Sequence, residues 1–107
     1  MIGIGTWSCR IDTLFFKGEA SIKIFDDNGE YGVELQIPDV EIPEVEIVEI
    51  DADEENKVVD AVARISLLPG KDITCHFEFI DDDTFTGFLK IPFLGKVRLK
   101  DGKRVAA

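Results

Sequence analysis

Apolar and polar residues alternate with a period of two along most of this chain. The clearest stretch, Ile73–Phe79, places isoleucine, cysteine and two phenylalanines on one face and Thr74, His76 and Glu78 on the other. Such alternation is typical of a strand with one face buried and one face in water. The pattern predicts eight strands, at residues 7–12, 19–24, 31–37, 44–50, 57–67, 73–79, 84–91 and 96–100.

Turn-forming residues separate these segments. Asn28-Gly29 supplies the positive φ values of a tight hairpin, and Pro69-Gly70 marks a second turn. Three aspartates, Asp81 to Asp83, turn the chain a third time, and Pro92 to Gly95 precede the last strand. Because most connections are short, we expect an all-β, antiparallel, up-and-down meander.

Two segments depart from simple alternation. In residues 44–50, glutamates occupy the even-numbered positions 44 and 46, but the apolar residues Val48 and Ile50 occupy the next two even-numbered positions. This one-residue shift of the alternation indicates a β-bulge. Residues 57–67 satisfy helical spacing as well as alternation, so a short helix is the alternative there. Their β-branched content favours a strand.

A faint internal repeat bears on how the sheet curves. Gly32 and Gly87 each lie seven residues after the apolar residue that opens an acidic turn. A glycine within a strand often marks a bend or a close backbone approach, and two bends would help the meander curl into a closed barrel. Coincidence between two acidic hairpins is the alternative.

Length and charge narrow the class of protein. The 107 residues suit one domain, residues 1–107, with 45% apolar and 32% charged residues. The net charge is −10, and residues 1–56 hold 15 acids against 3 bases. This balance disfavours nucleic acid and anionic membranes as partners. With no apolar span and no signal-peptide pattern, we expect a soluble, cytoplasmic protein.

Gly5-Thr6-Trp7, at the head of the first strand, resembles the Gly-x-Trp start of lipocalin-like (calycin-type) barrels. Lys103-Arg104 is similar to the terminal basic residue that lies across that tryptophan in such barrels. The resemblance implies that Trp7 and Arg104 close the end of a small calycin-like barrel through a cation–π contact.

A second resemblance covers most of the chain. Asp82–Gly87, Pro92–Gly95 and Gly102–Arg104 are similar to the hairpin, the turn and the final "Gly-Lys-Arg" of a group of short bacterial domains without assigned activity. The chain is shorter than a standard lipocalin and has no room for a helical lid.

Familiar catalytic chemistries lack their residues. His76 is the one histidine, so His-based triads and metal sites have no partners for it. Cys9 and Cys75 fall on apolar faces, where free thiols are the favoured state and a disulfide between them is the alternative. The acidic turn after Ile50 fails the EF-hand pattern. We therefore expect no catalytic residue, no metal and no cofactor.

Bulky apolar residues occupy two connections where polar turns are usual. They are Leu14, Phe15 and Phe16 in one loop and Phe93 and Leu94 in another, and a meander opens both at one barrel end. They predict either a plug or an apolar rim for a ligand or partner chain. The leading expectation is a non-catalytic domain that binds a small apolar molecule in or at the mouth of the barrel. The alternative is a protein–protein module that forms a homodimer without a ligand.

Overall fold

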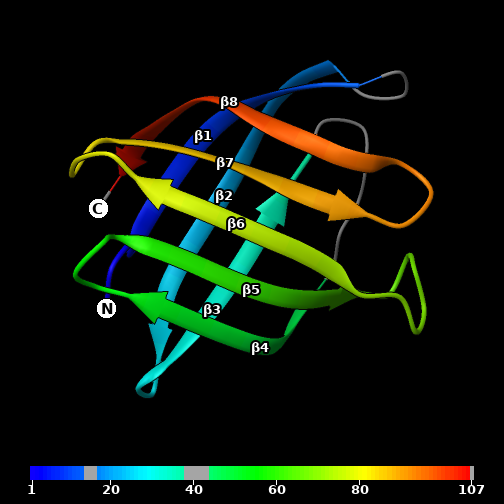
Figure 1. The fold of residues 1–107 in the computed structure, drawn as a ribbon, viewed down its shortest axis with the longest axis horizontal. Helices are drawn as coiled ribbons and strands as arrows, with labels where there is room; N and C mark the ends of the chain where they lie inside the picture. Colours follow the sequence, from blue (N-terminus) through cyan, green and yellow to red (C-terminus); the bar gives the residue numbers. More distant parts are fainter. Residues whose placement is uncertain (14–16, 38–43, 107) are drawn as a thin grey trace.

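The computed structural model describes residues 1–13, 17–37 and 44–106, and within them the chain is all β. The predicted eight antiparallel strands are confirmed (Figure 1). Their bounds are β1 Gly5–Asp12, β2 Lys17–Asp27, β3 Glu30–Gln36, β4 Val45–Asp53, β5 Val58–Ile65, β6 Ile73–Phe79, β7 Thr84–Ile91 and β8 Gly95–Ala106. Residues 57–67, for which a helix was the alternative, contain strand β5.

The strands form one sheet in the order β3-β2-β1-β8-β7-β6-β5-β4. Each strand pairs antiparallel with its neighbour, and β1 pairs with β8, so the first and last strands lie side by side. The sheet curls until its two ends, β3 and β4, approach each other, with β5 to β7 crossing in front of β1 to β3 (Figure 1). The result is a nearly closed barrel, and we call the unpaired boundary between β3 and β4 the seam.

Predicted turn and bulge positions explain much of this curvature. Asn28 and Gly29 have φ values of 54° and 92°, as the Asn-Gly hairpin requires. The bulge predicted in β4 is present, because the register with β5 shifts between Ile47 and Glu49. Gly87 packs against the backbone of His76 so closely that a Cβ atom would collide with its carbonyl oxygen. Gly32 instead lies beneath the ring of Phe25, so the two glycines of the faint repeat serve different contacts.

The last strand is longer than alternation predicts. It was expected to end at Lys100, with Lys103 and Arg104 beyond it, but β8 continues to Ala106. Asp101 adopts a left-handed φ of 53°, and Gly102 packs under Phe85. This irregularity interrupts the alternation of apolar and polar residues, but the strand continues beyond it. The continued strand brings Arg104 into register with Trp7.

The core lies inside the barrel and is built from the inward parity of the strands. Trp7 is the largest fully buried side chain among the described residues, and inward residues of β2, β5, β6, β7 and β8 surround it and Cys9. Leu67, the last residue of the strand predicted at 57–67, is exposed, because β5 ends at Ile65 and a turn follows. The amide of Leu68 donates to the Ile65 carbonyl in that turn.

Candidate functional site

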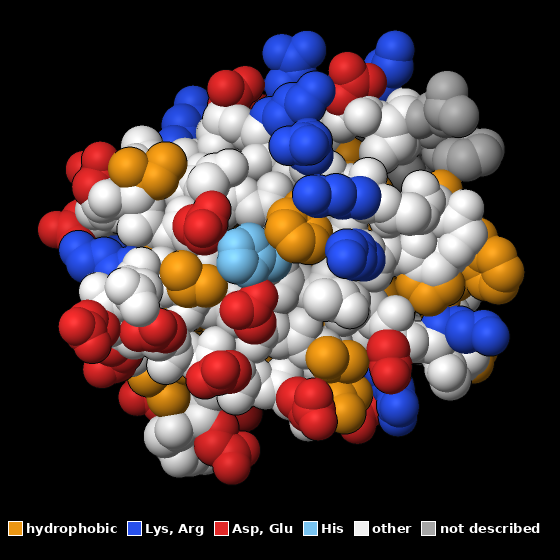
Figure 2. Space-filling view, viewed as in Figure 1, with side chains coloured by type: hydrophobic (Ala, Val, Ile, Leu, Met, Phe, Trp, Pro, Cys, Tyr) orange, Lys and Arg blue, Asp and Glu red, His pale blue; other side chains and the backbone are white. Residues whose placement is uncertain are grey.

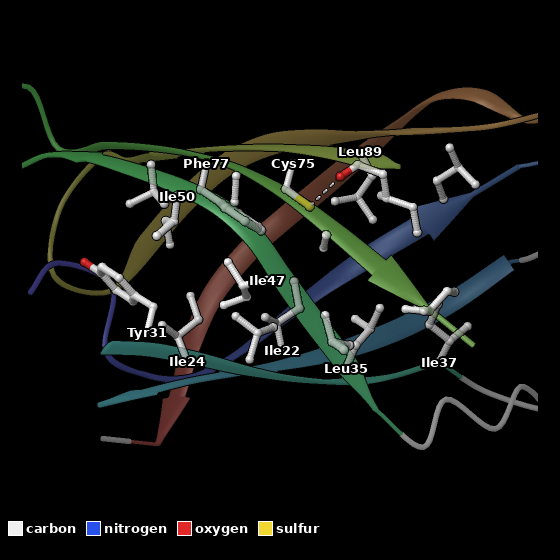
Figure 3. Close-up of a pocket in the computed structure, with 18 of the residues that line it drawn as sticks. Ile22, Ile24, Tyr31, Leu35, Ile37, Ile47, Ile50, Cys75, Phe77 and Leu89 are labelled. Atoms are coloured by element: carbon white, nitrogen blue, oxygen red, sulfur yellow. Dashed lines mark hydrogen bonds between the residues drawn. The ribbon is translucent and has the colours of Figure 1, made fainter. Parts of the chain in front are cut away.

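An apolar cavity of about 120 Å³ lies inside the barrel, between the seam strands and β5 and β6 (Figure 3). Tyr31, Leu35 and Ile24 face Phe77, Cys75 and Leu89 across it, and Ile47 of β4 lies between the two groups. The only polar side-chain groups among the described residues that line it are the Tyr31 hydroxyl and the Cys75 thiol. The lining residues are Ile2, Ile22, Ile24, Tyr31, Val33, Leu35, Ile37, Val45, Ile47, Ile50, Val59, Ala61, Ala63, Ile65, Ile73, Cys75, Phe77, Leu89 and Ile91.

Small inward residues on neighbouring strands leave this space open. Ala61 and Ala63 occupy successive inward positions of β5. Ala61 pairs with Cys75 of β6 on one side and with Ile50 of β4 on the other. Because protein interiors are otherwise close-packed, three small side chains at adjacent positions leave a void that larger neighbours do not fill.

The two polar groups of the lining already have partners. The Tyr31 hydroxyl donates a hydrogen bond of 2.8 Å to the Ile2 carbonyl. Burial raises the pKa of Tyr31 above its ordinary value. The Cys75 sulfur lies 3.8 Å from the Ile73 carbonyl, and burial raises the pKa of Cys75 to about 11. At neutral pH the cavity therefore presents neutral groups, and its thiol is not a nucleophile.

Aromatic rings fill the part of the interior next to the cavity. Trp7 contacts Phe79 at 5.2 Å and Phe85 at 5.4 Å between ring centroids, and Phe77 lies 5.9 Å from Phe85. The indole Nε1 donates to the Gly3 carbonyl at 2.9 Å. The guanidinium carbon of Arg104 lies 4.3 Å from the centre of the indole. The structure thus brings together Trp7 and Arg104, the two residues expected to close the barrel.

A groove runs along the outer side of the seam, with a volume of about 500 Å³. Five residues line both the groove and the cavity, namely Tyr31, Val33, Leu35, Val45 and Ile47. The cavity and the groove therefore meet at the seam. Among the described residues, the side chains of β3 and β4 form the wall that has the cavity on its inner side and the groove on its outer side.

The residues expected to form an apolar rim are not among those that line the cavity. Leu14, Phe15 and Phe16 lie outside the described residues. Phe93 lies in the turn between β7 and β8 with 87% of its surface exposed, and Leu94 is half-buried beside it. The ammonium of Lys71 lies 6.0 Å from the Phe93 ring. The rim role of these residues stays a prediction.

Titratable residues outside the cavity form local surface contacts. His76 lies on the outer face of β6, with Nδ1 2.6 Å from Asp60 and its ring stacked on Phe88. Asp53, the last residue of β4 and the start of the acidic turn, accepts hydrogen bonds from the side chain and backbone of Asn56, which lower its pKa. The acidic turn thus contains an aspartate that stabilises its own loop.

In the part of the chain that the structure describes, no group of three or more His, Cys, Asp or Glu side chains is placed to hold a metal ion. No helix of the described part is long and apolar enough to cross a membrane. Both cysteines are free; Cys9 is buried, and burial raises its pKa to about 11.

The sequence led us to expect a ligand in or at the mouth of the barrel, and it did not predict the seam or the cavity beside it. The feature of the sequence that could have indicated the cavity is the pair Ala61 and Ala63, because two small side chains on the inner face of one strand leave space beside them. Comparison of the chain with protein-family models, with curated proteins and with solved structures found no match.

Proposed function

We propose that this chain is a non-catalytic binding domain that holds a small apolar molecule in the cavity between the seam and β5. The observation that supports this proposal is the cavity itself, which has a volume of about 120 Å³ and is lined by apolar side chains. Its two polar groups already make local contacts with Ile2 and Ile73. A ligand there gains from burial of its apolar surface and has no hydrogen-bonding requirement to meet.

The volume limits the size of the ligand. An apolar cavity of roughly 150 Å³ binds benzene in a well-studied engineered protein and otherwise stays dry. A cavity of about 120 Å³ therefore suits a single ring or a short alkyl chain rather than a fatty acid. An unfilled space of this size costs roughly 3 kcal/mol of stability at about 24 cal/mol per Å³, and a bound ligand offsets part of that cost.

The lipocalin-like resemblance supports the same proposal. Gly5-Thr6-Trp7 begins β1, and Arg104 lies over Trp7 at the closed end. Barrels of that kind carry ligands in their interior, so a cavity inside the sheet is the expected place for one. The cavity supports the proposal independently of this resemblance, because a fold alone does not determine function.

Hexan-1-ol, an uncharged probe with a six-carbon apolar tail, tests the proposal through the melting temperature. A ligand that binds only the folded state stabilises it by mass action, by about 1.4 kcal/mol at ten times the dissociation constant. For a domain of this size, each kcal/mol of added stability raises the melting temperature by roughly 4–8 °C. Native mass spectrometry of freshly purified protein would detect a retained natural ligand.

A pair of variants ties the effect to the cavity. Ala61→Leu fills the space from β5 and should remove the response to hexan-1-ol. Val62→Leu adds bulk at the adjacent residue, which does not line the cavity, and should leave the response intact. An equal response in both variants, or none in the original chain, would contradict the proposal.

One observation favours a second candidate function, dimerisation through the end that carries Phe93. A ring that is 87% exposed on a monomer is unusual for so large an apolar side chain. A second copy covering this end would bury it. Light scattering tests the second function, which requires a dimer, and hexan-1-ol binding tests the first, which holds for a monomer or a dimer.

A further inference from the structure

The seam groove differs in charge from the cavity that it meets. Its lining contains three carboxylates, those of Asp27, Glu34 and Glu44, together with the ring of Phe25. No lysine or arginine is among the described residues that line it. The groove therefore presents negative charge directly outside an apolar interior.

Bases are absent from a long stretch of sequence around the seam. From Ile24 to Asn56 the chain has no lysine, arginine or histidine, and this stretch includes β3 and β4. The nearest base along β2 is Lys23, which pairs in register with Glu34. Its ammonium lies 5.7 Å from the Phe25 ring centre. Phe25 thus already accepts a cation on the groove side of the sheet.

Positive side chains lie on another part of the surface. Lys90, Lys96, Arg98, Lys100 and Lys103 belong to β7 and β8. Lys and Arg side chains gather in the upper part of the face shown in Figure 2, the part where β7 and β8 lie in Figure 1. Asp and Glu side chains dominate the lower part of that face. Because the basic side chains sit on β7 and β8, several strands away from the seam in the sheet order, they neutralise the groove little.

We propose that the ligand of this domain is a cationic amphiphile, an amine with a short alkyl or aryl tail. The inference rests on the proposed function, because the cavity is the binding site and the carboxylates set only the charge of the ligand. The tail occupies the cavity beneath Tyr31, Leu35 and Ile47, and the ammonium lies in the groove near Glu34 and Glu44. Those two carboxylates flank the seam from β3 and from the residue before β4.

Both parts of such a ligand find matching surroundings. Each methylene buried in the cavity contributes roughly 0.8 kcal/mol. The ammonium stays in the groove, which is open to solvent, so it avoids the desolvation cost of a buried charge while remaining close to opposite charges. An anionic amphiphile of the same length would place its carboxylate among Asp27, Glu34 and Glu44, where like charges repel.

Three probes of equal tail length test the charge preference by calorimetry near neutral pH. They are hexan-1-amine, hexan-1-ol and hexanoate. We expect hexan-1-amine to bind about fivefold more tightly than hexan-1-ol, as one or two exposed charge pairs would give. Hexanoate should bind most weakly, and the advantage of the amine should shrink in high salt.

A charge-matched pair of variants locates the effect. Glu34→Gln combined with Glu44→Gln should reduce the affinity for hexan-1-amine to that for hexan-1-ol and leave hexan-1-ol binding unchanged. Glu19→Gln combined with Glu78→Gln changes net charge equally on β2 and β6, away from the groove lining, and should preserve the preference.

The outcomes separate this inference from the function on which it rests. Binding of all three probes with equal affinity, or loss of the preference in both double variants, overturns the cationic ligand and leaves an apolar binding domain. Failure of all three probes to bind overturns the proposed function and the cationic ligand together.

Discussion

Arg104 lies over the indole of Trp7, with the guanidinium carbon 4.3 Å from the ring centre, although 97 positions separate the two residues in sequence. The same guanidinium donates to the Ile4 carbonyl at 2.5 Å and, through Nε, to the Asp82 carbonyl at 2.6 Å. One side chain thus joins the segment before β1, the β6–β7 connection and β8. A lysine has no planar fork with which to make all three contacts.

Arg104→Lys should therefore lower the free energy of unfolding by about 1–2 kcal/mol, as expected for a lost cation–π contact and a lost charged hydrogen bond. Urea denaturation measures the effect. Arg98→Lys, at an exposed site on the same strand, serves as control and should change stability by less than about 0.5 kcal/mol. Equal effects at both sites would show that the contacts of Arg104 add nothing.

Trp7→Ala should cost about 3–5 kcal/mol, because it removes a large aromatic side chain with 1% of its surface exposed and leaves a cavity among Phe79 and Phe85. Chemical denaturation followed by circular dichroism reports the loss. A cost below about 1 kcal/mol would argue against a barrel closed around this residue.

Gly87→Ala should destabilise by about 1–3 kcal/mol, because the added Cβ would collide with the His76 backbone, which cannot move independently of β6. Gly32→Ala should cost less, since the Cβ there meets the side chain of Phe25, which can rotate away. Thr86→Ala, at an exposed neighbouring position, provides the baseline. The reverse order of Gly87→Ala and Gly32→Ala in thermal denaturation would be inconsistent with the described packing.

Stability should fall as the pH rises from about 9 to about 11. Burial raises the pKa of Cys9 and of Cys75 from 9.0 to about 11. In this window the unfolded chain loses thiol protons that the folded chain keeps, so the unfolded state is favoured as pH increases. Cys9→Ala combined with Cys75→Ala should flatten that slope in urea titrations at several pH values. An unchanged slope in the double variant would assign the fall to other groups.

Phe93→Asn should leave stability and hexan-1-ol binding unchanged, because Phe93 is exposed, does not line the cavity and has a left-handed φ of 73° that asparagine tolerates. Light scattering before and after the change tests the second candidate function. A dimer that becomes a monomer would support dimerisation through this end, whereas a constant monomer mass would exclude it.

Alternation predicted the strands because one residue in two must face the core of a half-buried sheet. It also located the bulge near Val48, since a change of parity can be read directly from the residues. The Asn28-Gly29 hairpin followed from its turn chemistry. The full length of β8 was missed because Asp101 interrupts the alternation through its backbone conformation, and a φ value leaves no mark on hydrophobic periodicity.

The cavity and the seam could not be read from the same pattern. Periodicity identifies which side chains point inward, but it does not report whether their volumes fill the space between curved layers. Ala61, Ala63 and Cys75 become neighbours only through the pairing of β5 with β6. Likewise, only the pairing of β1 with β8 places the seam between β3 and β4, two strands that the short-loop rule would have joined.

The pairing of β1 with β8 also has a consequence for folding kinetics. The sheet has the order of a simple meander that runs from β4 to β8 and then from β1 to β3. In the natural chain, β1 can pair with β8 only after the two ends of the sequence come together. The Arg104–Ile4 hydrogen bond, for example, closes a loop of 100 residues. A circular permutant that links β8 to β1 and begins at β4 would pair only strands that are consecutive in its chain. Its lower contact order should make it fold faster than the natural chain while keeping the same sheet.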